Sequence, residues 1–298
     1  MELVLSTILN QVEESNPIFA TSLRKEMILV DSEFSDLQKH LIAKFMCFLE
    51  LQGKDLNYGV GCLLKKYEDL FEEQLKFYRT GKYSQNSFEQ VNKAVYNNPA
   101  IMEYHTIGLL MFEILTSINY KKLSFQIEIL QSLKNNISRY LEIGGGHGMY
   151  LWEAEKLLPK NVTFDLVDIS ETSISIAKLF LQNIPVNYYR KDIFTFTSES
   201  DYDFICMGEI LEHMENPGEL LIKAKSMLNP FGSIFITVPI NNPTIDHIYL
   251  FESVEQVRSL LNQNSLSIIK EKVVPVHEIS IDEAERRKMP IEYFVLVR

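Results

Sequence analysis

The pattern of hydrophobic positions changes near residue 125 of this 298-residue chain. Before that point apolar residues recur every three or four positions, which is the spacing of one buried helix face. Two such runs are clear, Leu37, Leu41, Phe45, Phe48, Leu49 and then Leu63, Leu64, Tyr67, Leu70, Phe71, Leu75. Loops between helices are predicted at Gly53, at 59–61 and at 81–87, where glycine and polar residues interrupt the pattern.

The segment Asn97-Asn98-Pro99 predicts the start of a further helix, with Asn98 as the N-cap and Pro99 in the first turn. This helix is expected to run from Ile101 to about Ile118 and is apolar on nearly every side. A helix of that kind is buried, either between layers of its own chain or against a second subunit.

After residue 125 short apolar runs alternate with helical patterns. Strands are predicted at 138–143, 162–167, 186–189, 204–207 and 233–238, and helices at 149–158, 173–182, 219–228 and 254–261. A closing hairpin is predicted from 266–274 and 293–297. Strands that alternate with helices at this spacing indicate an α/β fold, in which a mostly parallel sheet is covered on both faces. The expected domains are residues 1–125, all-helical, and residues 126–298.

Composition narrows the class of protein. Lysine and arginine number 29 against 40 aspartate and glutamate residues, so the formal net charge is -11. That balance argues against nucleic acid as the main partner, because such binding depends on clustered basic residues. Cys47, Cys62 and Cys206 lack the spacing of a disulfide framework or zinc site. With no signal-peptide pattern and no membrane-length apolar run, the protein is expected in the cytoplasm.

The chemically informative segment is Glu142-Ile143-Gly144-Gly145-Gly146-His147-Gly148, which lies between a predicted strand and a predicted helix. Glycines permit a sharp turn there and let the backbone approach a ligand closely. Twenty residues after Gly148 the next strand ends at Asp168, whose carboxylate is placed to accept hydrogen bonds from ribose hydroxyls. The turn and the acidic residue together indicate a nucleotide-like ligand more strongly than the glycines do alone.

Two common nucleotide motifs do not fit this turn. The dinucleotide pattern G-x-G-x-x-G, started at Gly144, requires glycine where Met149 stands, and no Gly-Lys-Ser/Thr of a P-loop follows. What remains is an acidic residue followed by alternating glycines. This resembles motif I of the class I S-adenosylmethionine-dependent methyltransferases, which implies a Rossmann-like domain over residues 126–298 and S-adenosyl-L-methionine as cofactor.

Further segments match that family in order. The resemblance implies that the cofactor is bound by Glu142, Gly144, Gly145, Gly146 and Gly148 of motif I, by Asp168 and Ile169 at the ribose, by Asp192 and Ile193 at the adenine, and by Gly208 and Glu209 under the methionine part. The segment Leu228-Asn229-Pro230-Phe231-Gly232 resembles the family's turn before the fifth strand, although Phe231 departs from the usual glycine.

The first 125 residues match no motif as specific. In this family, helices that precede the core commonly form a lid over the cofactor and a substrate chamber; a homodimer interface is the alternative for this chain. The stretch from Val95 to His105 weakly resembles O-methyltransferases of peptide natural-product clusters, including lanthipeptide-type carboxylate methyltransferases. It contains Tyr104, a candidate cofactor contact.

The methyl acceptor is the least determined feature. No Asn/Asp-Pro-Pro-Tyr/Phe run of amine and amide methyltransferases follows the fourth strand, so oxygen is the predicted acceptor atom, on a small molecule or a peptide C-terminal carboxylate. A carboxylate acceptor is already ionised near pH 7 and therefore requires no general base. It does require a nearby cation, and the basic clusters 286–288, 190–191 and 121–122 are the candidates. A phenol or alcohol requires a base, for which His247 is the candidate, with activity rising near pH 6.5.

Other outcomes remain open from the sequence. An N- or C-methyltransferase of a small metabolite is one alternative, and a cofactor-binding regulatory module without turnover is another. No cluster of His, Cys, Asp or Glu has metal-ligand spacing, so no metal is expected.

Overall fold

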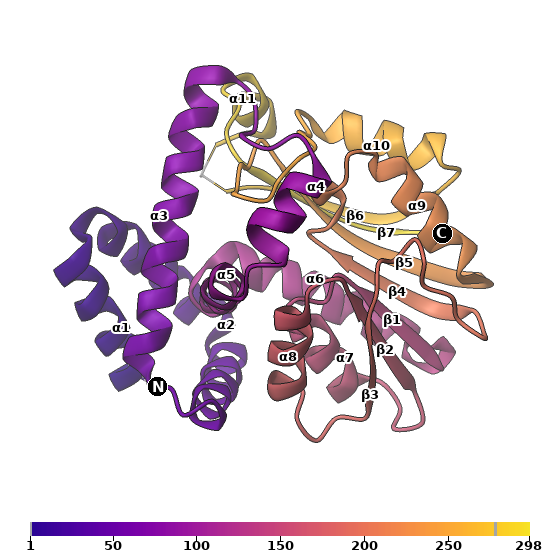
Figure 1. Cartoon of the computed structure of the whole chain (residues 1–298), viewed down its shortest axis with the longest axis horizontal. Helices are drawn as coiled ribbons and strands as arrows, with labels where there is room; N and C mark the ends of the chain where they lie inside the picture. The colour runs from indigo at the N-terminus through magenta and orange to yellow at the C-terminus, as the bar shows by residue number, and fades with distance from the viewer. Residues whose placement is uncertain (1, 277–278) are drawn as a thin grey trace.

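The computed structural model describes residues 2–276 and 279–298. Helices gather on one side of the molecule and a seven-stranded sheet, flanked by further helices, lies on the other (Figure 1). This arrangement confirms the predicted α/β class with an N-terminal helical region.

Every strand predicted from the sequence overlaps an observed one. The strands are β1 (Arg139–Ile143), β2 (Thr163–Asp168), β3 (Val186–Arg190), β4 (Tyr202–Gly208), β5 (Leu228–Ile240), β6 (Ile268–Pro275) and β7 (Ile291–Val297). Their order is β3-β2-β1-β4-β5-β7-β6. The first five run parallel, and β7 runs antiparallel to both β5 and β6, which confirms the closing hairpin.

The segment 228–232 differs from the expected turn. It belongs to β5, because Leu228 pairs with Tyr202 before the register shifts between Tyr202 and Phe204. Phe231 stands out of the sheet and is 84% exposed. An irregular strand start therefore takes the place of a tight turn.

Two hydrophobic cores cover the two faces of the sheet. Side chains alternate along β1, so that Tyr140 packs in one core while Leu141 and Ile143 pack in the other. The first core lies under α6 (Ser117–Leu133), α7 (Met149–Leu157) and α8 (Glu171–Phe180), and the second under α9 (Pro217–Ser226), α10 (Val254–Gln263) and α11 (Ile281–Arg286). The short helices η2 (Lys134–Asn136) and η3 (Leu211–His213) connect sheet and helices.

The N-terminal region is helical, as predicted. Its elements are α1 (Glu2–Ser15), α2 (Pro17–Leu51), α3 (Leu56–Thr80), α4 (Phe88–Val91), the π-helix η1 (Asn92–Tyr96) and α5 (Pro99–Leu115). The predicted loop at 59–61 is wrong, because these residues lie within α3. Gly59 is needed for close packing there: a Cβ on it would lie 3.0 Å from the ring of Phe45.

Helix α5 begins as predicted, with the Asn98 side chain accepting a hydrogen bond from the backbone N–H of Ile101. It ends earlier than predicted. Thr116 is extended (φ -119°, ψ 136°), and the chain turns there by 83° into α6. The apolar run through Ile118 therefore spans two helices, because hydrophobicity alone does not reveal a bend.

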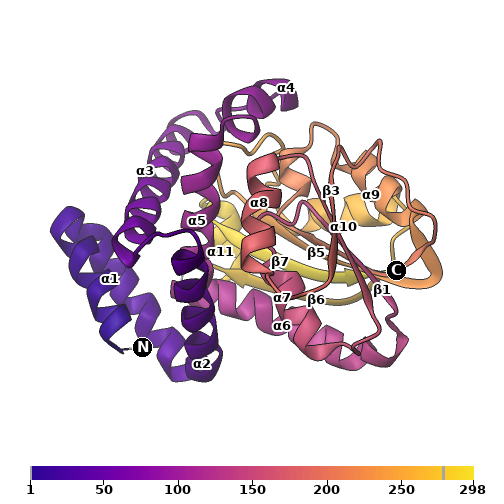
Figure 2. The same cartoon turned by 60° about the horizontal axis from the view of Figure 1, so that its bottom comes forward.

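The burial of α5 is confirmed. Ile107, Leu110 and Leu115 are fully buried. Figures 1 and 2 show α5 between α3 and the sheet domain, so layers of the same chain cover it. The homodimer interface stays a prediction. So does the division at residue 125, although α6 runs through that position without a break.

No single helix among the described residues is long and apolar enough to cross a membrane. Only α5 and residues 117–136 taken together, with the bend between them, reach the length and apolar composition of a membrane span.

The contact between α3 and α5 gives a first prediction. A Cβ on Gly108 would lie 2.7 Å from the Cβ of Lys66 and 2.8 Å from the carbonyl oxygen of Cys62. We expect Gly108→Val to separate the helices and lower the free energy of unfolding by about 1–3 kcal/mol. Urea denaturation measures this change.

The matched control is Gly61→Ala in α3, where a Cβ would meet nothing within 4 Å. We expect this variant to be unchanged or more stable by about 0.4–1 kcal/mol. Equal stability of Gly108→Val and the parent would contradict the packing described for these helices.

Candidate active site

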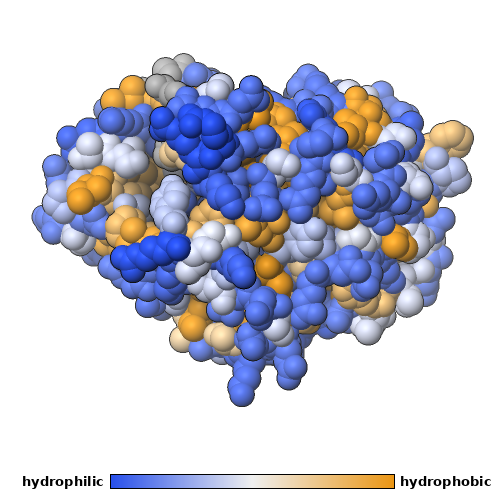
Figure 3. Space-filling model, turned by 90° about the horizontal axis from the view of Figure 1, so that it is seen from above, coloured by the Kyte–Doolittle hydropathy of each residue, from blue (hydrophilic) through white to orange (hydrophobic). Residues whose placement is uncertain are grey.

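A cavity of about 940 Å³ lies between the helical region and the carboxyl ends of β1, β2 and β4. Both halves of the chain line it. The helical side contributes apolar walls from Phe19, Leu23, Tyr67, Leu70 and Phe112. On the face of the molecule seen in Figure 3, hydrophobic groups are separated by hydrophilic ones. The cavity is thus the place where the glycine turn meets the N-terminal helices.

The glycine turn shapes one wall. The N–H of Gly144 donates to the carbonyl of Val167 at 2.8 Å, which ties the turn to β2. Gly146 has φ +49°, a left-handed conformation, and a Cβ on it would meet only one atom within 4 Å. Gly144, Gly145 and Gly146 line the cavity, whereas Gly148 caps α7 and is not among the described lining residues.

Asp168 ends β2 beside this turn. Its carboxylate accepts hydrogen bonds from the N–H groups of Gly146 (3.1 Å) and Ser170 (2.8 Å). Burial raises the pKa of Asp168 to about 6, against the lowering effect of these donors. Asp168 and Ile169 both line the cavity, as the ribose assignment requires.

The remaining motif positions converge on the same cavity. Asp192 and Ile193 follow β3, Gly208 is the last residue of β4, and Glu209 comes directly after it; all four line the cavity. Gly208 lets the ring of Tyr150 approach, since a Cβ there would lie 2.4 Å from that ring.

Glu142 lies at the end of β1 and also lines the cavity. It is buried, and the Tyr140 hydroxyl lies 3.4 Å from its Oε2. Burial raises the pKa of Glu142 to about 8.

Tyr104 lies elsewhere. Its hydroxyl donates to Asp69 on α3 at 2.8 Å, and it is not among the described residues that line the cavity. The structure therefore gives no support to the expected contact with the cofactor. Tyr96, eight residues earlier on η1, lines the cavity and contacts Nδ1 of His213 at 2.9 Å.

Beyond the glycine turn the cavity reaches a buried group of charged side chains. Lys66 on α3 lies 3.3 Å from Nδ1 of His105 on α5, and Nε2 of His105 lies 3.5 Å from the Asp246 carboxylate. Burial alone would raise the pKa of Asp246, but His105, His213 and Lys66 hold it well below its ordinary value. Asp246 thus joins the sheet-side loop to the helical wall.

Lys122 on α6 forms a second buried contact between the halves. Its Nζ lies 3.3 Å from Glu209 and 3.5 Å from Glu292 on β7. Burial would lower the pKa of Lys122, but the two carboxylates raise it well above its ordinary value. The cluster at 121–122, considered as a cation for an acceptor carboxylate, is therefore already paired with acidic residues at Lys122.

His247 lines the cavity in the loop after β5, as expected. Its Nδ1 lies 2.7 Å from the carbonyl of Asn242, and its Nε2 lies 3.8 Å from Oε1 of Glu212. Burial, together with His213 and Lys66, lowers the pKa of His247 to about 3. The expected rise in activity near pH 6.5 is therefore not supported for this imidazole, which stays neutral at that pH.

The structure also brings together residues that the sequence did not connect. Glu212 and His213 on η3 meet His247 from a loop 34 positions later, in a group able to hold a metal ion. The expectation of no metal site rested on spacing along the chain, which does not report such a meeting. The adjacent Glu212 and His213, just after the predicted cofactor residue Glu209, are the available signal in the sequence.

Comparison with known families identifies the chain. Residues 117–281, more than half of its length, match a family described as methyltransferase domain. The chain belongs to this methyltransferase family.

Curated relatives of this methyltransferase include two bacterial proteins named ubiquinone biosynthesis O-methyltransferase. The protein of Rickettsia bellii (strain OSU 85-389) is 29% identical over 130 residues, which cover 42% of this chain and 53% of the relative. The protein of Coxiella burnetii (strain Dugway 5J108-111) is 29% identical over 124 residues, which cover 41% and 51%. The chain thus spans about half the length of the curated relatives it matches.

Solved structures share the fold of the methyltransferase. The mitomycin 7-O-methyltransferase MmcR has a TM-score of 0.53 and 12% identity, with 77% of this chain and 67% of that chain covered. The N-methyltransferase NodS from Bradyrhizobium japonicum WM9, in complex with S-adenosyl-l-homocysteine, has a TM-score of 0.50 and 15% identity, with 72% and 98% covered. Since an O- and an N-methyltransferase match almost equally, the fold does not decide the acceptor atom.

Family and fold together confirm a class I S-adenosylmethionine-dependent methyltransferase with S-adenosylmethionine as its cofactor. The individual cofactor contacts stay predictions, and each of the following experiments tests one of them.

Gly146→Val of the methyltransferase should abolish detectable binding of S-adenosylhomocysteine, because the side chain would fill a lining position of the cavity. The control is Gly53→Val, which has the same left-handed backbone (φ +64°) and equally open surroundings, but does not line the cavity. We expect both variants to lose about 1–2 kcal/mol of stability and only Gly146→Val to lose binding. Isothermal titration measures affinity. Parent-like binding by Gly146→Val would mean that motif I is misplaced.

Asp168 should make cofactor binding depend on pH. Its carboxylate binds ribose hydroxyls only when charged, so affinity should fall as the pH drops through about 6. At pH 7.5 we expect Asp168→Asn to bind S-adenosylhomocysteine about tenfold to a hundredfold more weakly than the parent.

The difference between parent and variant should shrink toward pH 5, where the parent carboxyl is protonated and resembles the amide. Titrations at the two pH values measure the ratio of affinities. A constant ratio would show that Asp168 does not titrate in this range, and a ratio of one at pH 7.5 would remove it from the cofactor site.

Proposed function

We propose that this methyltransferase transfers a methyl group from S-adenosylmethionine to an oxygen atom of a small molecule, with a peptide C-terminal carboxylate as the second candidate acceptor. The observation that carries this proposal is one cavity that is lined by the glycine turn and Asp168 and also by His213, Asp246 and His247. The O-methyltransferase names of the matched relatives support oxygen as the acceptor atom.

The residues present fit the cofactor. The open, left-handed backbone at Gly146 leaves room for a ligand, and the Asp168 carboxylate lines the cavity beside it. We propose that these two positions hold the ribose end, and that Asp192 and Ile193 hold the adenine. We propose that Glu142, Gly208 and Glu209 contact the methionine part of the cofactor. When bound, the cofactor supplies a methyl group on a positively charged sulfur.

The acidic surroundings favour a hydroxyl acceptor over a carboxylate. Glu209 and Asp246 line the cavity, and its two buried lysines already contact other residues, while the exposed Lys191 of the 190–191 cluster also lies on the lining. A carboxylate would be repelled by these charges, whereas a hydroxyl donates its proton to an imidazole or carboxylate. His213 and His247 are available on the lining for that contact. The peptide natural-product acceptor accordingly ranks second.

The chain contributes orientation and exclusion of water more than covalent chemistry. Residues of α2, α3 and α5 line the cavity together with the carboxyl ends of the strands, and in this proposal they shield the acceptor from solvent. Fixing the two reactants in line in such a space accounts for a large part of the rate increase in reactions of this kind. The lid role of residues 1–125 follows from the same geometry and belongs to this proposal.

A substrate screen with methyl-labelled cofactor tests the acceptor class. It should contain phenols and alcohols, free and peptide C-terminal carboxylates, and amines of matched size. We expect label in a base-stable ether product from the hydroxyl compounds and little or none from the carboxylates.

Each alternative has its own result in this screen. A base-labile product would indicate an ester and favour the carboxylate acceptor, and N- or C-methylation without ether formation would contradict oxygen. Tight binding of S-adenosylhomocysteine without turnover of any acceptor would favour the regulatory module.

A further inference from the structure

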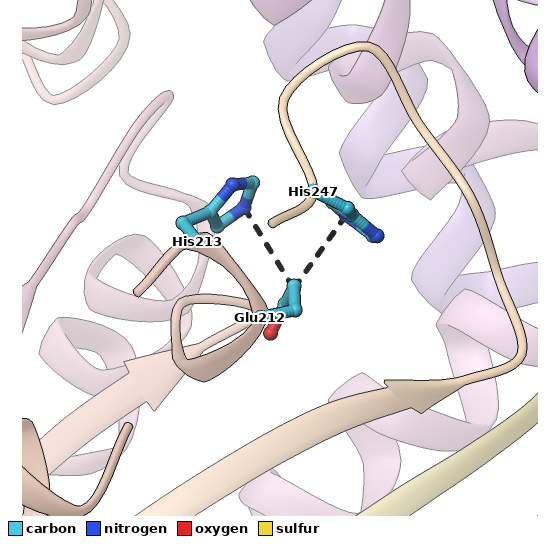
Figure 4. Close-up of side chains that lie close together, drawn as sticks. All are labelled: Glu212, His213 and His247. Carbon is cyan, nitrogen blue, oxygen red and sulfur yellow. Dashed lines mark ion pairs between the residues drawn. The ribbon is translucent and has the colours of Figure 1, made fainter. Parts of the chain in front are cut away.

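Three potential metal ligands meet beside the part of the cavity that His213, Asp246 and His247 line, which is called the acceptor end below. Figure 4 shows the Glu212 side chain between the rings of His213 and His247. Oε1 of Glu212 lies 3.7 Å from Nε2 of His213 and 3.8 Å from Nε2 of His247. One ligand atom from each residue falls within 4.8 Å of the others. The ligands come from two separate segments, η3 and the loop after β5, which the sheet holds side by side.

Both imidazoles are oriented by their other nitrogen. Nδ1 of His247 lies 2.7 Å from the carbonyl of Asn242, and Nδ1 of His213 lies 3.0 Å from the carbonyl of Asp246. A carbonyl only accepts hydrogen bonds, so each Nδ1 carries the proton and each Nε2 exposes a lone pair. The Tyr96 hydroxyl also lies 2.9 Å from Nδ1 of His213 and helps to fix the ring. Metal-binding histidines are commonly oriented by such second contacts.

Glu212 provides the independent observation. Its side chain is completely buried, and neither carboxylate oxygen has a hydrogen-bond donor among the described residues. A buried carboxylate without a donor is strongly unfavourable. Two lone pairs and an unsatisfied carboxylate therefore converge with no proton donor between them. A cation would satisfy all three.

The wider surroundings are also negative. The carboxyl groups of Glu209, Glu292 and Asp246 act electrostatically on the buried Glu212 side chain. The nearby cations are engaged elsewhere, Lys122 with Glu209 and Glu292, and Lys66 with His105. The local field thus favours a bound cation and disfavours an empty, ionised carboxylate.

We propose that Glu212, His213 and His247 bind one divalent metal ion of the Zn²⁺ type. Two imidazoles and one carboxylate form a ligand set of catalytic zinc sites, whereas Mg²⁺ prefers oxygen ligands. In tetrahedral Zn²⁺ geometry adjacent ligand atoms lie about 3.4 Å apart. The separations from Glu212 to the two imidazoles, 3.7 and 3.8 Å, are close to this value, and the three ligand atoms all lie within 4.8 Å of one another.

Three protein ligands leave a fourth position for another molecule. His213 and His247 line the cavity, so that position is accessible to a substrate. If the proposed function holds, an acceptor hydroxyl would occupy it, and the ion would orient the oxygen and lower the pKa of the hydroxyl. This role rests on the proposed function, whereas the metal site itself does not.

Metal binding is testable without a substrate. The full chain is treated with a chelator, dialysed, and titrated with Co²⁺ and Zn²⁺ alone. We expect one ion per chain, with Co²⁺ producing the visible absorption of a tetrahedral site with nitrogen and oxygen ligands, and Zn²⁺ displacing it. Glu212→Gln and His247→Ala should each weaken binding about tenfold to a hundredfold or more.

The control is His40→Ala, which removes an exposed histidine of α2 and should bind like the parent. All variants are made in a Cys47→Ser background, because Cys47 is an exposed thiol and thiols are metal ligands. Thermal unfolding and S-adenosylhomocysteine affinity without metal confirm that each variant is folded; a variant that fails is replaced by His213→Gln.

Two results would overturn the site: no stoichiometric Co²⁺ bound by the parent, or parent-like binding by folded Glu212→Gln and His247→Ala. Methyl transfer that persists unchanged in the metal-free enzyme would overturn only the role of the ion at the acceptor. Failure of the proposed function would instead appear as lost S-adenosylhomocysteine binding or an absence of turnover with the metal bound.

Discussion

The parallel pairing of β1 with β2 on one side and with β4 on the other is the constraint on which the site depends. It brings the carboxyl ends of the three strands to one edge of the sheet. The glycine turn, Asp168 and Gly208 each follow directly from one of these ends, so they meet although they are far apart in sequence. Ligands of open α/β sheets bind at such an edge because neighbouring loops diverge there.

The helical region completes the site by close packing. Gly108 lets α5 approach α3 at the level of Lys66, which places Lys66 and His105 against the loop that carries Asp246. Lys122 makes a second buried contact, from α6 to Glu209 and Glu292 on the sheet side. Because buried charges of this kind require their partners, the two halves are coupled through the walls of the cavity. The proposed lid would therefore be held by charge as well as by apolar contact.

The acidic character of the chain is concentrated where it has a chemical consequence. Glu142, Asp168, Glu209, Asp246 and Glu292 all line one cavity. A cationic cofactor is compatible with these acidic side chains. The same acidic surroundings favour a cation bound by His213, His247 and Glu212. The net negative charge of the chain therefore bears on the ligands of this cavity as well as on nucleic acid.

The sequence by itself determined the α/β class, the order of strands and helices, and the cofactor family. These are local properties: apolar periodicity defines the elements, and a glycine turn after a strand requires only neighbouring residues. Local pattern failed where the backbone bends or packs closely without a change in hydrophobicity. Thr116 divides an apolar run into two helices, and Gly59 lies within a helix because Phe45 packs against it.

Only the tertiary structure decided the acceptor end. Glu212 and His213 were visible as neighbours, but their contact with His247 depends on how β4 and β5 lie side by side. The lowered pKa of His247 depends on burial and on Lys66, which comes from a helix far away in sequence. Tyr104 was assigned to the cofactor by its position in the chain, yet it faces Asp69. Side-chain chemistry of this kind depends on long-range packing, which no local pattern records.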